Sequence, residues 1–233
     1  MKKFMKAIAA IMLMTAVLFA AGCKPEDEPN NGGGNGTYNG HEYVDLGLPS
    51  GTLWATCNVG SDTPEGYGDH FAWGETMPKT TYNWSTYKYS NGDSKELTKY
   101  CNNSFFGYED FADTLTTLLP EDDAATAQWG SGWCTPTADQ LRELYTNTSQ
   151  NMTTQNGVYG CLFTASNGNS IFMPTAGRYW DDEHSFDGSY GFYWASSLDT
   201  NYPCNAISIG FTQEGEDSRC SGQSVRPVRS LQD

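Results

Sequence analysis

The sequence predicts an α+β domain with a mainly antiparallel sheet, because helix signals in the middle of the chain are preceded and followed by strand patterns. The strongest helix signal runs from Thr137 to Tyr145. An Asn-Gly pair at 167–168 separates two apolar runs, which is typical of a β-hairpin. Three short apolar segments between residues 191 and 228 have the length and composition of strands.

The chain before the helices opens with a strand pattern at 41–46, a Pro-Ser-Gly turn and a second pattern at 52–59, which together predict a hairpin. A short apolar piece follows at 71–75. Residues 82–108 are rich in Tyr, Asn, Ser and Lys without a sustained period, so we expect a long surface excursion. Residues 111–119 are expected to be strand-like or irregular.

Two helices are expected next. Residues 121–128 carry acids at their start, where the helix dipole favours negative charge, and predict a short first helix. The second helix follows an aromatic, glycine-rich turn that we call the hub. Four residues form the hub: Trp129, Trp133, Pro136 and Thr137.

The hub is expected to organise the fold rather than to bind a ligand. Thr137 and Gln140 have the spacing of a capping box, so the second helix should begin just after Thr137. Leu141, Leu144 and Tyr145 form one apolar stripe that must pack against another element. The two Trp rings of the hub are large enough to anchor that helix to a sheet.

The second half of the chain is expected to be mostly β-structure. The polar stretch 147–156 is expected to be a loop. Residues 157–164 and 170–174 would form the two strands of the Asn-Gly hairpin. Three short strands are then expected to close the domain: 191–197, 206–211 and 224–228.

The N-terminus predicts export and attachment to a membrane. Residues 1–22 have a basic start and an apolar run, as in a secretory signal. The sequence around Cys23 resembles a bacterial lipobox, in which this cysteine becomes the lipidated N-terminus; a plain signal peptide is the alternative. Residues 23–36 have the composition of a flexible tether, and residues 37–233 are expected to form one domain.

Charge constrains the location and partners of the protein. The acidic patch after Cys23 is similar to the surface-export signal of Bacteroidetes lipoproteins, which implies an outer membrane lipoprotein exposed at the cell surface; a merely solvated tether is the alternative. The expected partners then include the membrane, through the lipid anchor. Removal of the signal leaves 10 Lys or Arg against 28 Asp or Glu, a formal charge of −18, which argues against nucleic acid as a partner.

Six cysteines follow Cys23, and an exported protein can bridge them. Six cysteines allow fifteen pairings, among which the sequence does not choose. No pair has C-x-x-C spacing, and His41, His70 and His184 are far apart in the sequence, so a zinc or redox site has little support.

Seven sequence blocks in order resemble the Fibrobacter succinogenes major paralogous domain of Bacteroidetes surface lipoproteins, over about residues 38–228. Each block is weakly specific alone, but their joint occurrence is specific. Where the family usually has Arg after the second Trp, this chain has Cys134, which puts in doubt an ion pair at that position. The blocks lie at 44–55, 71–76, 122–125, 129–137, 171–177, 193–197 and 222–228.

The resemblance implies a C-type-lectin-like fold, distantly similar to formylglycine-generating enzymes and to the variable proteins of diversity-generating retroelements. In those variable proteins the C-terminal region displays the ligand-binding loops. By that analogy, and because the polar loops expected at 199–202 and 213–219 suit adaptable recognition, we expect ligand binding near the C-terminus; ordinary hairpin loops are the alternative. The candidate ligand-binding residues are Tyr193, Asp199, Asn201, Tyr202, Asn205, Gln213, Glu216, Ser218 and Arg219.

The sequence supplies no recognisable set of nucleophile, base and metal ligands, so no catalytic residues and no cofactor are expected. Calcium is possible at Asp181–Glu183 or Glu214–Asp217, although a solvated acidic face explains both. The expected function is a cell-surface lipoprotein with a non-catalytic binding or display domain, whose partner is a surface protein or a glycan. A structural or adhesive envelope component and a polysaccharide-active enzyme are the alternatives.

Overall fold

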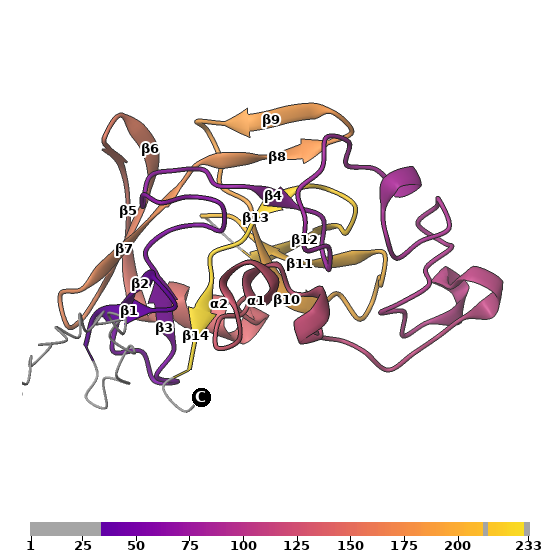
Figure 1. The fold of residues 1–233 in the computed structure, drawn as a ribbon, viewed down its shortest axis with the longest axis horizontal. Helices are drawn as coiled ribbons and strands as arrows, with labels where there is room; N and C mark the ends of the chain where they lie inside the picture. Colours follow the sequence, from indigo (N-terminus) through magenta and orange to yellow (C-terminus); the bar gives the residue numbers. More distant parts are fainter. Residues whose placement is uncertain (1–33, 212–213, 231–233) are drawn as a thin grey trace, which may run out of the picture.

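The fold is seen in a computed structural model that describes residues 34–211 and 214–230 (Figure 1). The signal segment, Cys23 and most of the tether lie outside the described residues, as does Gln213. The described chain contains two α-helices and four sheets, and β10–β13 is the one parallel pair among the paired strands. The α+β class with a mainly antiparallel arrangement is therefore confirmed.

The first sheet joins early and late parts of the chain. Its strands, in spatial order, are β1 (Gly36–Tyr38), β2 (His41–Asp45), β3 (Leu53–Ala55) and β14 (Val228–Arg229). The predicted hairpin of β2 and β3 is present, with Val44 opposite Trp54, although β3 is shorter than predicted. Trp54 also lies opposite Val228, so β3 is enclosed on both edges.

The second sheet carries the C-terminal strands. Its order is β12 (Glu214–Ser218), β11 (Asn205–Ile209), β10 (Tyr193–Leu198), β13 (Gln223–Ser224) and β4 (His70–Phe71). The interpretation of residues 213–219 as a loop was wrong for the described part. Those residues pair with β11 from Asn205 opposite Ser218 to Ile209 opposite Glu214.

Two further sheets complete the β-structure. One consists of β5 (Thr148–Gln155), β6 (Val158–Ala165) and β7 (Ser170–Pro174), and the other of β8 (Ala176–Trp180) and β9 (Glu183–Asp187). The Asn-Gly hairpin is present, with Gly168 at φ 86° in its turn. The loop predicted for 147–156 was wrong, because all eight residues of β5 pair with β6. Their mostly exposed side chains account for the polar sequence.

The hub leads into a helix where the sequence predicts one. After α1 (Ala124–Trp129), α2 (Ala138–Asn147) begins with both hydrogen bonds of a capping box between Thr137 and Gln140. The rings of Trp129 and Trp133 are buried and meet edge to face at 5.2 Å. The carbonyl of Pro136 accepts a 2.8 Å hydrogen bond from the Ser196 amide, which joins the hub to β10.

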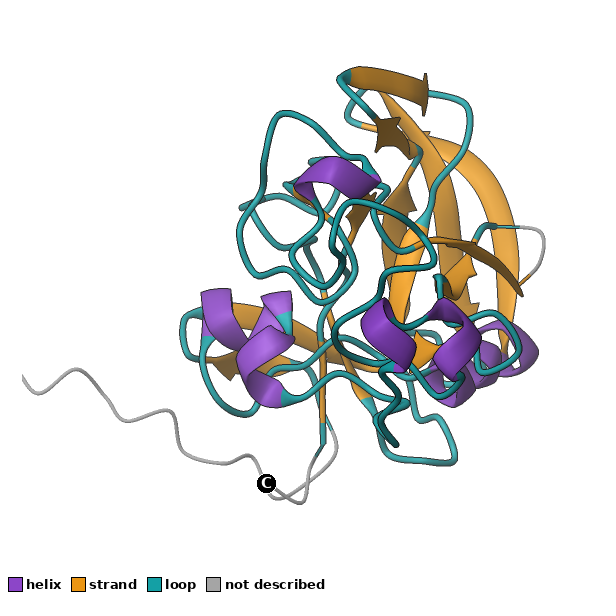
Figure 2. Cartoon of the chain, turned by 90° about the vertical axis from the view of Figure 1, so that its right-hand side faces the viewer, coloured by secondary structure: helices purple, strands orange, loops and turns teal. Residues whose placement is uncertain are grey.

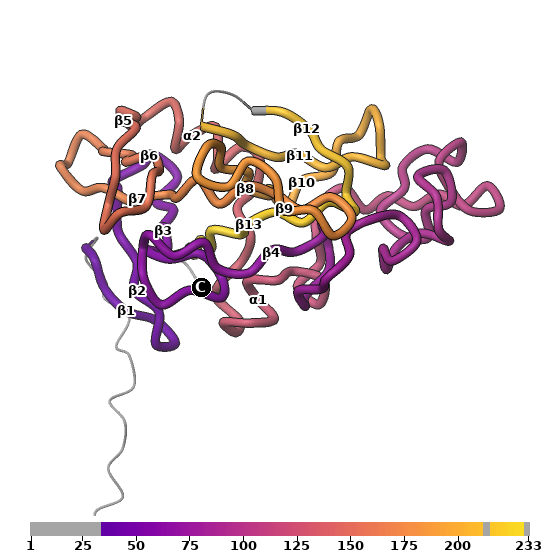
Figure 3. Tube along the Cα trace, turned by 90° about the horizontal axis from the view of Figure 1, so that it is seen from above, coloured from indigo at the N-terminus to yellow at the C-terminus, as the bar shows by residue number. Residues whose placement is uncertain are grey.

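The excursion at 82–108 leaves the sheets and then returns (Figures 1 and 3). The prediction of a surface segment was incomplete, because several tyrosines of the excursion are buried in the core. Those tyrosines are Tyr82, Tyr87, Tyr89 and Tyr100. The excursion and the segment that follows it contain four 3₁₀ turns: η1 (Trp84–Thr86), η2 (Ser104–Phe106), η3 (Tyr108–Asp110) and η4 (Pro120–Asp122).

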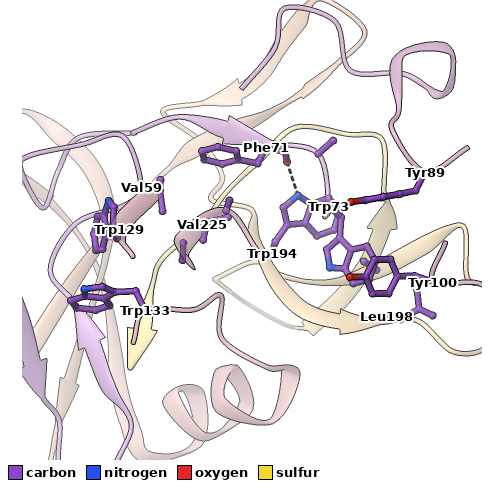
Figure 4. Close-up of a cluster of buried hydrophobic side chains, with 14 of the residues drawn as sticks. Val59, Phe71, Trp73, Tyr89, Tyr100, Trp129, Trp133, Trp194, Leu198 and Val225 are labelled. Atoms are coloured by element: carbon purple, nitrogen blue, oxygen red, sulfur yellow. Dashed lines mark hydrogen bonds between the residues drawn. The ribbon is translucent and has the colours of Figure 1, made fainter. Parts of the chain in front are cut away.

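Most of the long strands gather on one side of the domain, and most of the loops lie on the other (Figure 2). Large aromatic rings are buried in the core. The indole N–H of Trp194 donates to the carbonyl of Phe71 at 2.8 Å (Figure 4), and that of Trp73 donates to the carbonyl of Ala195 at 2.8 Å. Large rings can therefore be buried without leaving these two donors unpaired.

Candidate functional site

Two of the candidate ligand-binding residues lie in the interior, so the expectation that they contact a ligand was wrong. Tyr193 and Arg219 are both 0% exposed. The Tyr193 hydroxyl donates to the carbonyl of Pro174 at 2.8 Å. The Arg219 guanidinium donates to the Tyr87 hydroxyl and to three main-chain carbonyls at 2.9–3.1 Å, so its hydrogen-bonding capacity is used within the fold.

Four other candidates lie in the loop between β10 and β11 and its edge. Asp199 is buried and accepts hydrogen bonds from the Asn201 and Tyr202 amides, so it shapes the turn. Asn205 is half-buried at the start of β11, while Asn201 and Tyr202 are exposed. Asp199 and Asn201 also border a shallow hollow of about 360 Å³ beside α2. This loop therefore offers a small number of polar contacts and one exposed ring.

Glu216 and Ser218 lie on β12, and they differ in exposure. Glu216 is exposed and borders a pocket that is also lined by residues of β8, β9 and β11, whereas Ser218 is half-buried and pairs with Asn205 across the sheet. Gln213 lies outside the described residues. Of the predicted set, Glu216 alone among the described residues borders this pocket.

The pocket has a volume of about 760 Å³ and is lined by residues of β8, β9, β11 and β12, with the Arg178–Asp217 ion pair joining β8 to β12. Exposed apolar side chains gather around it. Nine large apolar residues of the described chain are exposed, and four of them line this pocket: Met152, Tyr159, Phe186 and Tyr190. Exposed apolar groups concentrated at one hollow are typical of a binding site.

Three rings form the aromatic wall of the pocket: Phe186, Tyr190 and Phe192. The ring centroids of Phe186 lie 5.8 Å from those of both other residues, and the Tyr190 and Phe192 centroids lie 6.4 Å apart. Their interplanar angles are 87°, 56° and 39°, so the wall presents ring faces and edges in several directions.

The local backbone explains how Phe186 reaches the wall. Phe186 has a φ of 64°, a left-handed conformation that is a strained outlier for a bulky residue. Its carbonyl accepts hydrogen bonds from the Ser189 and Tyr190 amides, which closes the turn into the next segment. Opposite it, Gly177 has a φ of 65°, and a Cβ there would lie 2.4 Å from the Ser185 carbonyl oxygen. The strand pair can therefore accommodate only glycine at this point.

A polar group borders the same pocket beside the rings. Arg178 forms an ion pair with Asp217, and its guanidinium lies 5.1 Å from the Phe192 ring centroid and 5.7 Å from that of Phe186. The Gln223 amide donates to the same Asp217 carboxylate at 2.7 Å, and Ser208 donates to Gln223. This chain of hydrogen bonds fixes the position of the ion pair.

His70 of β4 attaches the β8–β9 hairpin to the body of the domain, and His184 of β9 contacts the same carbonyl from within the hairpin. The Nε2 atoms of His70 and His184 lie 3.1 and 2.8 Å from the same carbonyl oxygen, that of Ala176. Burial lowers the pKa of His70 from 6.5 to about 4, with a smaller lowering from His184, against the hydrogen bonds that raise it. His70 is therefore neutral at physiological pH.

A second buried carboxylate cluster serves the fold. Asp122 is 3% exposed and accepts hydrogen bonds from the hydroxyls of Tyr89 and Tyr100 and from the Lys99 ammonium. Burial alone would raise the pKa of Asp122, but those hydrogen bonds lower it overall. The cluster joins the excursion to the segment before α1 and has no opening toward a ligand in the pockets described above.

The remaining predictions about chemistry concern metals, cysteines and the membrane. Among the described residues, no group of three or more His, Cys, Asp or Glu side chains could hold a metal ion. Five of the cysteines after Cys23 are unbridged in the structure: Cys57, Cys101, Cys161, Cys204 and Cys220. No helix within residues 34–211 and 214–230 is long and apolar enough to span a membrane.

The chain was compared with known proteins in three ways. No family model matches it, and no curated protein or solved structure matches it.

Proposed function

We propose that this protein is a surface-anchored, non-catalytic binding domain, and that its ligand enters the aromatic pocket beside the C-terminal strands. One observation carries the proposal: four of the nine exposed large apolar residues in the described chain line the same hollow. Leaving such groups in water is unfavourable, so their concentration at one place favours an interaction site.

The proposed recognition surface is still in the C-terminal region, but its centre is the pocket and not the loop at 199–202. The loop at 199–202 contributes one large exposed ring, that of Tyr202, whereas the pocket combines an aromatic wall with a fixed ion pair. Glu216 remains part of the proposed site because it borders the pocket. The resemblance to the Fibrobacter succinogenes major paralogous domain, with its C-type-lectin-like fold, supports a binding role and remains part of the proposal.

Binding is favoured over glycoside hydrolysis by the placement of the pocket carboxylates. Glycosidases flank the bond to be cleaved with two carboxyl groups. Glu216 and Asp217 are neighbours on one strand, so their side chains leave it in opposite directions. Asp217 is also held by Arg178 and Gln223, which leaves it poorly placed to act as an acid or a nucleophile.

The proposed location is the outer face of the outer membrane, with lipid on Cys23. The apolar signal, the lipobox-like sequence and the acidic tether support this location. Metabolic labelling with a radioactive fatty acid tests it: label should enter the wild-type chain and not a Cys23→Ala variant. Incorporation into the variant would contradict the assignment of Cys23 as the lipidated residue.

The binding proposal is tested with the mature chain, from Cys23 to Asp233, on glycan and protein arrays. A Phe186→Ala/Tyr190→Ala variant removes two exposed rings of the pocket, and a Tyr202→Ala/Phe105→Ala variant removes two exposed rings elsewhere. We expect binding that is lost in the first variant and kept in the second.

Loss in the control variant alone would place recognition outside the pocket. No binding by the wild-type chain would favour a structural or adhesive role in the cell envelope. Release of a reducing sugar from a polysaccharide, measured in parallel, would favour the enzymatic alternative.

A further inference from the structure

We propose that the aromatic pocket binds a neutral sugar ring, in preference to charged sugars and to flat aromatic groups. This inference rests on the proposed function, since it names the ligand class of the same pocket. It follows from three features of the pocket: its charge, the orientation of its rings and its fixed pair of donor and acceptor groups.

The first step concerns cations. An open wall of aromatic rings would attract a positively charged ligand through their electron-rich faces. In this pocket that position is already taken, because the Arg178 guanidinium lies 5.1 Å from the Phe192 centroid and 5.7 Å from that of Phe186. A second cation would be repelled by Arg178, so an amino sugar or an ammonium ligand is disfavoured.

The second step concerns anions. Arg178 could hold a carboxylate or phosphate, but Asp217 already occupies that role through an ion pair. Gln223 donates to the same Asp217 carboxylate oxygen at 2.7 Å. An anionic ligand would meet the Asp217 carboxylate and a guanidinium that is already paired. The pocket therefore favours a ligand without net charge.

The third step concerns shape. A flat base or aromatic side chain binds best between two parallel rings, but the three rings of the wall are mutually tilted by 39° to 87°. A pyranose ring suits such a wall, because its C–H faces can contact one ring face while its edge stays free. The Phe186 ring already packs beside the Tyr190 and Phe192 rings and the Arg178 guanidinium before binding, which reduces the ordering cost.

The fourth step concerns hydrogen bonds. Neighbouring hydroxyls of a sugar each donate and accept, so they match a site that presents a carboxylate acceptor next to guanidinium donors. Arg178 and Asp217 form such a pair, and both line the pocket beside the rings. Their side chains remain 31% and 15% exposed, so lone pairs and N–H groups are accessible to a ligand.

The inference is tested by titrating the full chain with four small probes. Methyl glucopyranoside, glucuronate and glucosamine share one ring and differ in charge, and N-acetylphenylalanine amide represents an apolar peptide group. Affinities are measured by ligand-observed NMR. For the wild-type chain we expect the neutral glycoside, or its galacto or manno isomer, to bind at least about 10-fold more tightly than the charged sugars.

Two variants, each of which removes one charge of the pair, then test the charge argument directly. Asp217→Asn leaves Arg178 without its partner, so the preference should shift toward glucuronate by about 10-fold. Arg178→Gln should shift it toward glucosamine. A merely structural role for the pair would weaken all sugars equally and leave the preference unchanged, which would contradict the inference.

The remaining outcomes separate this inference from the proposed function. Tyr190→Ala should weaken the neutral sugar by about 10-fold, while Tyr202→Ala should leave it unchanged. If the phenylalanine amide binds through Tyr190 and no neutral sugar does, the pocket is a peptide site, and the ligand class is wrong while the binding function stands. If no array ligand and no probe binds, both proposals fail.

Discussion

Arg219 and Arg178 both lie over aromatic rings, but one belongs to the interior and the other to the pocket. The Arg219 guanidinium lies 4.9 Å from the Trp73 ring centroid, is fully buried and donates to three main-chain carbonyls. Arg178 lies 5.1 Å from Phe192, is partly exposed and shares its charge with Asp217. The surroundings therefore decide whether an arginine on an aromatic ring stabilises a fold or can serve a ligand.

The two regions also differ in how completely their polar groups are used. The interior arginines, Arg219 and Arg226, donate hydrogen bonds to main-chain carbonyls of segments that are far apart in the sequence. The pocket arginine is held by one carboxylate and stays accessible. Full use of hydrogen bonds indicates a structural role, and partial use at a hollow with exposed rings indicates a binding role.

The largest change in stability is expected from a substitution in the interior. Arg219→Met should lower the free energy of unfolding by about 3–5 kcal/mol, because it leaves three buried carbonyls without donors. Arg178→Met should lower it by about 1 kcal/mol or less, since its ion pair is partly exposed. Urea unfolding of both variants measures the difference. Equal losses would show that the two arginines play the same role.

The next largest effect is expected at His70, which joins the interior to the pocket hairpin through the Ala176 carbonyl of β8. The pKa of His70 is about 4 in the folded state and 6.5 when unfolded, so the unfolded chain binds more protons between these values. Neutral His70 makes its full contribution to the free energy of unfolding above pH 6.5. About 3 kcal/mol of that free energy should be lost as the pH falls to 4.

Urea unfolding of the wild-type chain and of His70→Gln between pH 7 and pH 4 measures this loss. The variant cannot titrate at this position, and its amide can still donate to the Ala176 carbonyl. Its stability should therefore depend less steeply on pH. Parallel pH curves for the two proteins would contradict the assignment of the loss to His70.

A smaller effect should appear at the strained residue of the pocket. Phe186 has a φ of 64°, which glycine adopts at little cost and alanine does not. Phe186→Gly should therefore be about 1 kcal/mol more stable than Phe186→Ala, although both lose the exposed ring. Thermal unfolding compares the two variants. A less stable glycine variant would contradict the idea that the backbone is strained there.

The smallest effect is expected at the β10–β11 loop. Tyr202 is 57% exposed, as Tyr190 is 58% exposed, so the two positions form a matched pair. Tyr202→Ala should change the unfolding free energy by less than about 0.5 kcal/mol and ligand affinity by less than about twofold. Affinity measured beside Tyr190→Ala tests this. A larger loss of affinity in Tyr202→Ala than in Tyr190→Ala would place the binding site at the β10–β11 loop.

The sequence predicted features that depend on neighbouring residues. The helix start depends on Thr137 and Gln140, which are three residues apart, and the hairpin turn depends on the adjacent residues Asn167 and Gly168. The aromatic wall escaped prediction because its hairpin, β8–β9, reads as mixed polar and aromatic chain without clear alternation. Tyr193 and Arg219 were misplaced for a related reason. Their type and position suited a polar surface, and only contacts with distant residues, such as Pro174 and Tyr87, bury them.

The strands that complete two of the sheets come late in the chain. Val228 lies opposite Trp54, and Ser224 lies opposite His70, so each pairing spans more than two-thirds of the described sequence. Folding that depends on such distant contacts is slow, because a large loop must close before its ends interact. During the export that we propose, the helices and the central hairpins can form as they emerge, but both sheets must wait for residues 223–229. A chain exported in this way would remain open until its C-terminal strands had crossed the membrane.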